Sequence, residues 1–229
     1  MLNYYDGINC FTDASIVTSN GTYIASAGYC IVRDSRILER DYKIIYDATN
    51  SYGELYALYL GIMALSRYRE YNMPLHVFSD SKISILGSNQ WIFNWVSKFN
   101  MYPSDKGLTT NTNNTVANQE LYLSIINFIY NRNLKVKMYH TLGHINPRYQ
   151  ESLHKARTYF NKVNGERIGD DIAREICYYN NFVDKMTRNN LKDIVLSGVF
   201  EKDKYEKDIY PSVYIPDINV MSKYKGLIS

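Results

Sequence analysis

The sequence predicts an α/β fold in which a five-stranded mixed sheet, with three antiparallel strands and then parallel strands, is flanked by helices. Three apolar segments near the start of the chain are separated by short turn signals, which is typical of an antiparallel meander. Two later apolar segments each follow a helical pattern, which implies crossover connections and parallel pairing. The 229 residues, 45% of them hydrophobic, suffice for one packed domain with an extension.

The first three strands are expected over residues 8–16, 23–33 and 36–46. Asp34 and Ser35 form a tight-turn signal between the second and third of them. These strands are therefore expected to pair antiparallel.

A helix is expected over residues 51–71, because its apolar side chains recur at intervals of three and four. Asn50 or Ser51 is expected to cap its start. Pro74 ends the helical pattern, and residues 75–79 then form a short apolar segment that predicts a buried strand.

The remaining elements follow from the same signals. Helices are expected over residues 81–99, 117–131 and 148–163, a loop over 100–114, a strand over 134–141, a helix marked by Ile168, Ile172 and Ile176, and a last helix that carries Asp184. From Leu191 the apolar pattern fades, so residues 191–229 are expected to form a flexible or loosely docked extension, which is a candidate binding site for a protein partner.

Bulk composition restricts the setting of the protein. The formal net charge of +3 permits an anionic partner without requiring one. Cys10, Cys30 and Cys177 have no short spacing, so buried free thiols in a reducing compartment are expected. No signal-peptide order and no apolar run of about 20 residues is present, which predicts a cytoplasmic protein that does not enter a membrane.

Four acidic residues stand in distinct local contexts. Asp13 and Asp80 end apolar strands, whereas Glu54 and Asp184 lie on expected helices. Carboxylates without a neighbouring cysteine motif suit Mg²⁺ or Mn²⁺ better than zinc. A carboxylate cage for two such ions can hydrolyse a phosphodiester. Without metal, mutual repulsion would raise the pKa of some of these acids.

These residues, in this order, resemble the type 1 ribonuclease H family over about residues 5–190. The resemblance includes Thr49-Asn50-Ser51 before Glu54, the Asp80-Ser81 pair, the run Gln90-Trp91-Ile92-Phe93-Asn94-Trp95, and Gly143-His144. It implies an RNase H-like domain over 1–190 and an extension over 191–229. More residues separate His144 from Asp184 in the sequence than in typical members, which implies a helical insertion at 148–179.

The resemblance also implies an endonuclease that cuts the RNA strand of RNA–DNA hybrids with two Mg²⁺ ions, Mn²⁺ being the alternative. Asp13, as the bridging ligand, would hold these ions with Glu54, Asp80 and Asp184. His144 would assist proton movement or product release. The residues implied to contact substrate are Ala14, Ser15, Thr49, Asn50, Ser51 and Lys82.

Several of these assignments have alternatives. Asp170 and Asp171 rival Asp184 as the fourth ligand, because both fall within the insertion. Thr49 and Asn50 fit helix capping as well as phosphate contact. His144 is otherwise a plain loop residue. His140 is expected to be a strand residue whose side chain is hydrogen-bonded, and His154 a solvent-exposed helical residue. Trp91 and Trp95 are expected either to line a channel for DNA or to pack in the core.

Two rival functions and one hypothesis about the insertion stay open. The same fold serves DNA-processing nucleases of the resolvase or exonuclease type, and it can also serve as a non-catalytic nucleic-acid-binding module. Arg148, Lys155, Arg157 and Lys162 outnumber the single acid Glu151, so the inserted hairpin is hypothesised to contact nucleic acid.

Overall fold

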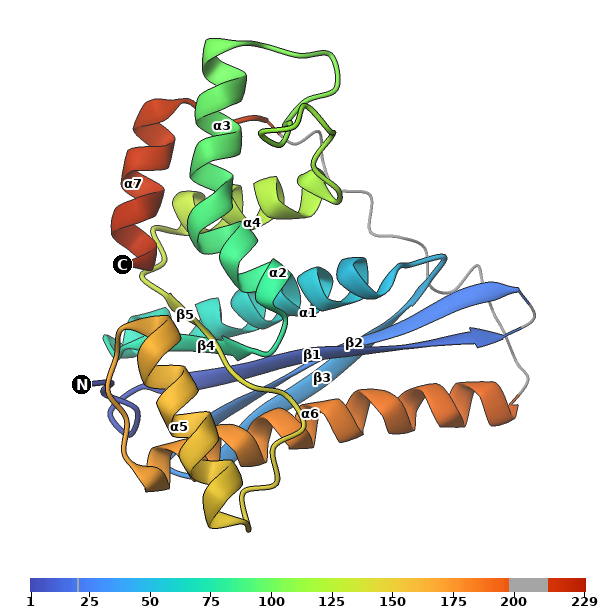
Figure 1. Ribbon diagram of the computed structural model, residues 1–229, viewed down its shortest axis with the longest axis vertical. Coiled ribbons are helices and arrows are strands. Elements are labelled where there is room, and N and C mark those ends of the chain that lie inside the picture. Colours follow the sequence, from blue (N-terminus) through green and yellow to red (C-terminus); the bar gives the residue numbers. More distant parts are fainter. Residues whose placement is uncertain (20, 198–213) are drawn as a thin grey trace.

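The computed structural model describes residues 1–19, 21–197 and 214–229. Its centre is a five-stranded sheet with the order β3-β2-β1-β4-β5 (Figure 1). The strands are β1 (Ile8–Ser19), β2 (Thr22–Arg33), β3 (Arg36–Tyr46), β4 (Leu75–Ser79) and β5 (Lys137–His140). β1, β2 and β3 pair antiparallel, and β1, β4 and β5 pair parallel. The mixed sheet expected from the sequence is confirmed.

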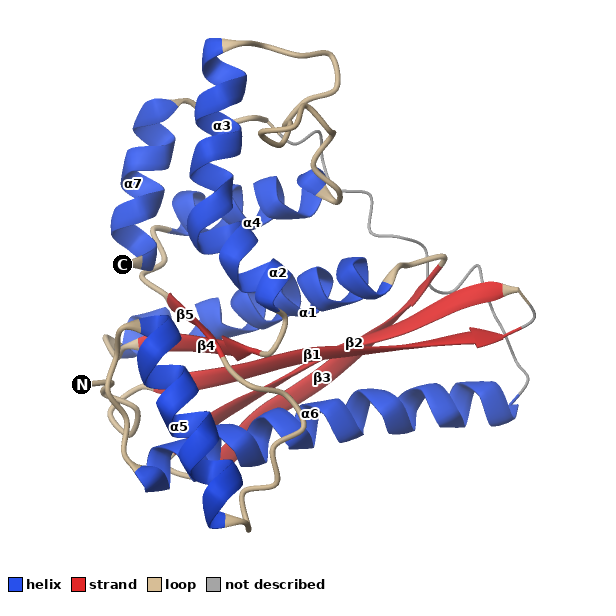
Figure 2. Cartoon of the chain, viewed as in Figure 1, coloured by secondary structure: helices blue, strands red, loops and turns tan. Residues whose placement is uncertain are grey.

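Helices lie on both sides of the sheet (Figure 2). They are α1 (Asn50–Leu65), the 3₁₀ turn η1 (Ser66–Tyr71), α2 (Lys82–Leu86), the π-helical segment η2 (Gly87–Trp91), α3 (Ile92–Met101), α4 (Gln119–Arg132), α5 (Gln150–Asn164), α6 (Asp170–Ser197) and α7 (Ile218–Ile228). α1 covers one face of β1 and β2, and α6 covers the other (Figure 1).

The α1 side of the sheet is a tightly packed core of aliphatic side chains and tyrosines. Gly61 of α1 lies directly over β1, and a Cβ at this position would stand 2.9 Å from the sulfur of Cys10. Glycine therefore lets α1 approach the strand that carries Asp13. Cys10, Cys30 and Cys177 are all buried free thiols, as expected.

The α6 side holds a cluster of aromatic rings. Phe11 of β1 stacks on Phe78 of β4 at 4.9 Å between ring centroids, and Phe78 stacks on Tyr139 of β5 at 5.3 Å. Phe160 of α5 and Tyr179 of α6 pack on the same cluster. Burial of such large side chains anchors α5 and α6 to the parallel strands.

Some element boundaries differ from those expected. Thr49, and neither Asn50 nor Ser51, caps α1, because its side chain accepts the N–H of Tyr52 at 3.2 Å. The helix expected over 51–71 tightens into a 3₁₀ turn after Leu65, and the one expected over 81–99 contains the π-helical segment η2. The strand expected over 134–141 is limited to β5, since Val136 donates its N–H to the carbonyl of Leu227 in α7.

α6 is a single helix of 28 residues. The sequence predicted two helices here, one marked by Ile168, Ile172 and Ile176 and one carrying Asp184. The break expected at Asn164-Gly165 is present, with Gly165 at a φ of +67° that favours glycine, and no second break follows within α6. Because α6 is continuous, the position of Asp184 is rigidly coupled to the helical hairpin that α6 forms with α5.

The C-terminal helix α7 was not predicted. Asp217 caps it by accepting the N–H groups of Asn219 and Val220, and Tyr224 is fully buried with its hydroxyl donating to the carbonyl of Ser88 at 3.0 Å. The part of the expected extension at 198–213 lies outside the described residues. In the described chain, no helix has the length and apolarity to cross a membrane.

Candidate active site

Asp13 and Asp80 lie on neighbouring parallel strands. The register pairs Thr12 of β1 with Ser79 of β4, so the next residue of each chain lies at the same level of the sheet. β4 ends at Ser79, whereas β1 continues beside β2. Asp13 is 8% exposed as a residue, and its Oδ1 accepts the N–H of Ala14 at 2.7 Å.

Glu54 enters from the first turns of α1. Its Oε2 accepts a hydrogen bond from the hydroxyl of Ser81 at 2.6 Å, and its Oε1 accepts one from Asn50 at 2.8 Å. Ser81 also caps α2 by accepting the N–H of Ser84. The residue next to Asp80 therefore orients Glu54, although 27 positions separate the two in sequence.

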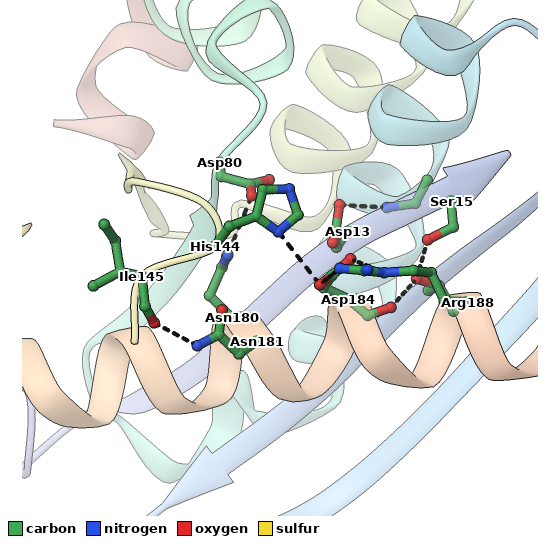
Figure 3. A network of polar contacts seen from close by, with 11 residues as sticks. Asp13, Ser15, Asp80, His144, Ile145, Asn180, Asn181, Asp184 and Arg188 are labelled. Atoms are coloured by element: carbon green, nitrogen blue, oxygen red, sulfur yellow. Dashed lines mark hydrogen bonds and ion pairs between the residues drawn. The ribbon is translucent and has the colours of Figure 1, made fainter. Parts of the chain in front are cut away.

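Asp184 reaches the same region from α6 (Figure 3). Arg188, one helical turn later, binds both carboxylate oxygens, with Nε 2.8 Å from Oδ1. The Nδ1 atom of His144 lies 3.6 Å from Oδ2. The hydroxyl groups of Thr187 and Ser15 form a hydrogen bond of 2.9 Å, which links this turn of α6 to β1.

Asp80 is held by the loop and the helix that surround it. Its Oδ2 accepts the side-chain N–H of Asn180 at 3.2 Å (Figure 3). A Cβ on Gly143 would collide with the same oxygen, so glycine lets the loop before His144 pass close to Asp80. His144 lies in this loop with a φ of +56° and a side chain 72% exposed.

The four carboxylates share one electrostatic environment. Burial raises the pKa of Asp13 well above its usual value, and the charge of Asp80 raises it further. Asp184 and Glu54 act in the same direction, while the hydrogen bond from Ala14 opposes them. The structure thus brings together the four acids that the sequence singled out.

The rival acids belong to a different contact. Asp170 begins α6, where a carboxylate favours the positive end of the helix dipole, and it pairs with Arg157 of α5 at 2.7 Å. Asp171 stands beside it in the same first turn. Neither contributes to the raised pKa of Asp13. This geometry favours Asp184 over both.

The donor set fits hard divalent cations, although the carboxylates are not closed around one. In the described residues, no three His, Cys, Asp or Glu side chains are grouped as they would be to hold an ion. Glu54, Asp80 and Asp184 instead point at protein donors. Among the described residues, the carboxylate of Asp13 accepts one hydrogen bond and is close enough to three acids for their charges to raise its pKa, so a cation would relieve both burial and repulsion.

The expected substrate contacts surround this cluster. Ala14 and Ser15 follow Asp13 along β1, and Lys82 is an exposed residue at the start of α2. Asn50 and Thr49 are exposed but already bonded, to Glu54 and to the backbone of Tyr52. Ser51, half-buried, is the second residue of α1.

The remaining histidines and tryptophans have structural contacts. His140 is buried with both ring nitrogens bonded, and burial lowers its pKa. His154 is an exposed helical residue that accepts from Arg157. Trp95 packs against Tyr122 at 5.4 Å between centroids, and the rings of Trp91 and Trp95 lie 6.1 Å apart. Core packing is thus favoured for Trp95.

Sequence reasoning missed several supporting residues. They are Ser81 as a partner of Glu54, together with Asn180, Thr187 and Arg188 on α6. A signal existed for Arg188, because an acid and a base four residues apart on a helix form a pair. No local signal marks the others, since their partners lie far away in sequence.

The comparisons with known proteins identify the family of the chain. The profile of the RNase H family matches residues 6–191, which is most of the chain. The chain therefore belongs to the RNase H family, whose members are ribonucleases that generally use divalent metal ions. A search of curated proteins found no match.

Two solved structures with a TM-score of 0.50 show the same fold at low identity. The foamy viral protease–reverse transcriptase in complex with RNA/DNA hybrid matches with a TM-score of 0.50 and 14% identity over 71% of this chain, which spans only 20% of that one. The PFV RNase H domain matches with a TM-score of 0.50 and 17% identity over 70% of this chain and 92% of the domain. LC11-RNase H1, isolated from compost by metagenomics, matches with a TM-score of 0.44 and 18% identity over 69% of this chain and 99% of that one.

Proposed function

We propose that the chain hydrolyses the RNA strand of RNA–DNA hybrids, with Asp13, Glu54, Asp80 and Asp184 as ligands of two Mg²⁺ ions. Membership of the RNase H family supports the reaction. We further propose that residues 1–190 form the catalytic domain, that 148–179 is an insertion within it, and that 191–229 is an extension.

The observation that carries the proposal is the environment of Asp13. This residue is 8% exposed, and the charges of three other acids, contributed by α1, α6 and the end of β4, raise its pKa. Such an arrangement is costly unless cations neutralise it. Because the donors are carboxylate oxygens and no thiol is among them, Mg²⁺ is favoured, with Mn²⁺ as its usual substitute.

Bound ions would supply charge stabilisation for the attacking and leaving oxygens of an in-line displacement. The protein supplies position. β1 and β4 hold Asp13 and Asp80 at one level of the sheet, Ser81 orients Glu54, and α6 carries Asp184. The exposed imidazole of His144, beside Asp184, is placed to move a proton or to help release the product.

Substrate choice is proposed to depend on the 2′-hydroxyl, which distinguishes RNA from DNA. The backbone at Ala14 and the Ser15 side chain follow Asp13 and would read the RNA strand. Thr49, Asn50 and Ser51 at the start of α1 would contact a phosphate of the other strand, and Lys82 would add a charge.

A cleavage assay with several substrates tests the proposal. Labelled hybrid, duplex RNA, duplex DNA and single strands are incubated with the protein and Mg²⁺, and Asp13→Asn serves as the inactive control. The expected result is cleavage of RNA only in the hybrid, lost in the variant. Cleavage of DNA would replace the proposal with a DNA-processing nuclease, and no cleavage with either Mg²⁺ or Mn²⁺ would leave a binding module.

A further inference from the structure

The helix α5 contacts the end of β5 beside Asp80. It belongs to the segment 148–179, whose basic residues suggested a nucleic-acid contact. One of them, Arg157, forms an ion pair with Asp170 of α6. Other side chains of α5, Tyr159 and Asn164, form hydrogen bonds with His140 at the edge of the sheet.

Asp80 is the first residue after β4, and its carbonyl lies beyond the strand pairing. The last backbone hydrogen bond in this direction runs from Thr141 N–H to the carbonyl of Ser79, at 2.9 Å. The next carbonyl, that of Asp80, lies 3.0 Å from Nε2 of His140. A side chain from the neighbouring strand β5 thus satisfies a carbonyl that lies beyond the strand pairing.

The imidazole of His140 is itself fixed by α5. Its Nδ1 lies 2.7 Å from the hydroxyl of Tyr159. Because the carbonyl of Asp80 can only accept, Nε2 carries the proton, and Nδ1 accepts from the Tyr159 hydroxyl. The two hydrogen bonds therefore run in one direction, from Tyr159 through His140 to Asp80.

Asn164, the last residue of α5, holds the backbone of His140. Its Oδ1 accepts the N–H of His140, and its Nδ2 donates to the His140 carbonyl, both at 2.9 Å. One side-chain amide thus takes the place that another strand would occupy at the edge of β5. Phe160 anchors the helix to Tyr139 at 5.5 Å between ring centroids, so α5 is rigidly seated.

We infer that α5 is a brace for the active site, in which Tyr159 is a positioning residue that fixes Asp80 through the ring of His140. The step from the brace to catalysis rests on the proposed function, in which Asp80 binds metal. Asn180 holds the Asp80 carboxylate from α6, and the brace holds its backbone from α5. Both anchors come from the hairpin of α5 and α6.

Amide hydrogen exchange tests the brace without metal or substrate. Tyr159→Phe removes only the donating hydroxyl and keeps the ring that packs on His140 at 5.5 Å. Tyr149→Phe is the matched control, because Tyr149 precedes α5 and is 65% exposed. We expect the backbone amides of residues 79–81 to exchange faster in Tyr159→Phe and at an unchanged rate in the control. Thermal melting curves would first establish that both variants are folded.

A second pair of variants tests the role of His140. His140→Gln keeps an amide that can donate to the Asp80 carbonyl and accept from Tyr159, whereas His140→Ala keeps neither. We expect protection of residues 79–81 to be largely retained in the glutamine variant and lost in the alanine variant. Unchanged exchange in Tyr159→Phe, or equal loss in both His140 variants, would overturn the brace.

Metal affinity and kinetics connect the brace to function. Calorimetric titration with Mn²⁺ is expected to show about tenfold weaker binding in Tyr159→Phe, the scale typical of outer-shell partners. The value of kcat at limiting metal should fall while KM and its salt dependence stay unchanged. A raised KM with a changed salt slope would instead assign α5 to nucleic-acid binding. If the wild type bound no metal and cut no hybrid, the proposed function would fail, and the exchange experiment would still decide the brace.

Discussion

At the scale of single residues, the site is defined by charges that are partly compensated within the protein. Asp13 is buried with one hydrogen bond, while Asp184 is neutralised by Arg188. A bidentate arginine–carboxylate pair is among the stronger charged contacts in proteins. Arg188 therefore acts as a fixed cation beside three other carboxylates, and a metal ion must share or replace it.

Replacement of the fourth acid tests its assignment. Asp184→Asn is expected to lower kcat on the hybrid by about a hundredfold or more, because a group at the reacting centre is lost. Asp170→Asn is the control, since the contacts of Asp170 are with Gln150 and Arg157 of α5. The two variants are compared in the same steady-state assay. Equal losses, or a larger loss for Asp170→Asn, would contradict the assignment.

Arg188→Gln tests the internal cation. Without Arg188 the carboxylates repel each other more strongly in EDTA, whereas Mg²⁺ compensates them. The difference in Tm between Mg²⁺ and EDTA is therefore expected to be larger than in the wild type by about 2–4 °C. Lys192→Gln, an exposed change on the same helix, should leave the difference unaltered. A difference no larger than that of the wild type would argue against this role.

At the scale of elements, the site depends on the pairing of β1 with β4. Behind the carboxylates, His76 of β4 lies with Nδ1 3.0 Å from the side-chain oxygen of Asn9 on β1. His76 is 3% exposed, and burial lowers its pKa to about 4, with the charge of Lys137 acting in the same direction. A neutral imidazole thus joins the two strands that carry Asp13 and Asp80.

The pH dependence of stability follows from this histidine. Between pH 6.5 and 4 the unfolded chain binds a proton at His76 that the folded chain does not, so the free energy of unfolding falls as pH falls. The effect is about 3 kcal/mol across this window. Urea unfolding of the wild type and His76→Gln should show a shallower pH dependence in the variant. Parallel curves would contradict the prediction.

The docking of α7 is tested by Tyr224. This side chain is fully buried and bonded to the carbonyl of Ser88, so Tyr224→Ala is expected to destabilise the protein by about 3–5 kcal/mol. Tyr224→Phe retains the ring and should cost about 1 kcal/mol. Denaturant unfolding measures both. If Tyr224→Ala lowered the free energy of unfolding by less than Tyr224→Phe does, α7 would not be packed as described.

At the scale of the whole molecule, local patterns predicted the sheet because each of its five strands carries its own apolar segment and turn signals. The two strand-end acids needed only the parallel register to meet. Other contacts join residues too far apart for any local pattern to indicate them, as with Ser81 and Glu54 or Asn164 and His140.

Boundaries were harder to predict than elements for the same reason. Thr49, Asn50 and Ser51 are all good caps, and only the backbone geometry selects Thr49. β5 begins later than expected, at Lys137, and Val136 just before it donates its N–H to the carbonyl of Leu227 in α7. Such choices depend on tertiary packing that composition does not report.

Anomalous diffraction from crystals soaked in Mn²⁺ tests the central claim most directly, because it locates the ions without reference to activity. The account predicts two peaks about 4 Å apart. Asp13 should lie between them, with Glu54, Asp80 and Asp184 in their coordination shells. Peaks remote from Asp13, or none at Mn²⁺ concentrations that support hybrid cleavage, would contradict it.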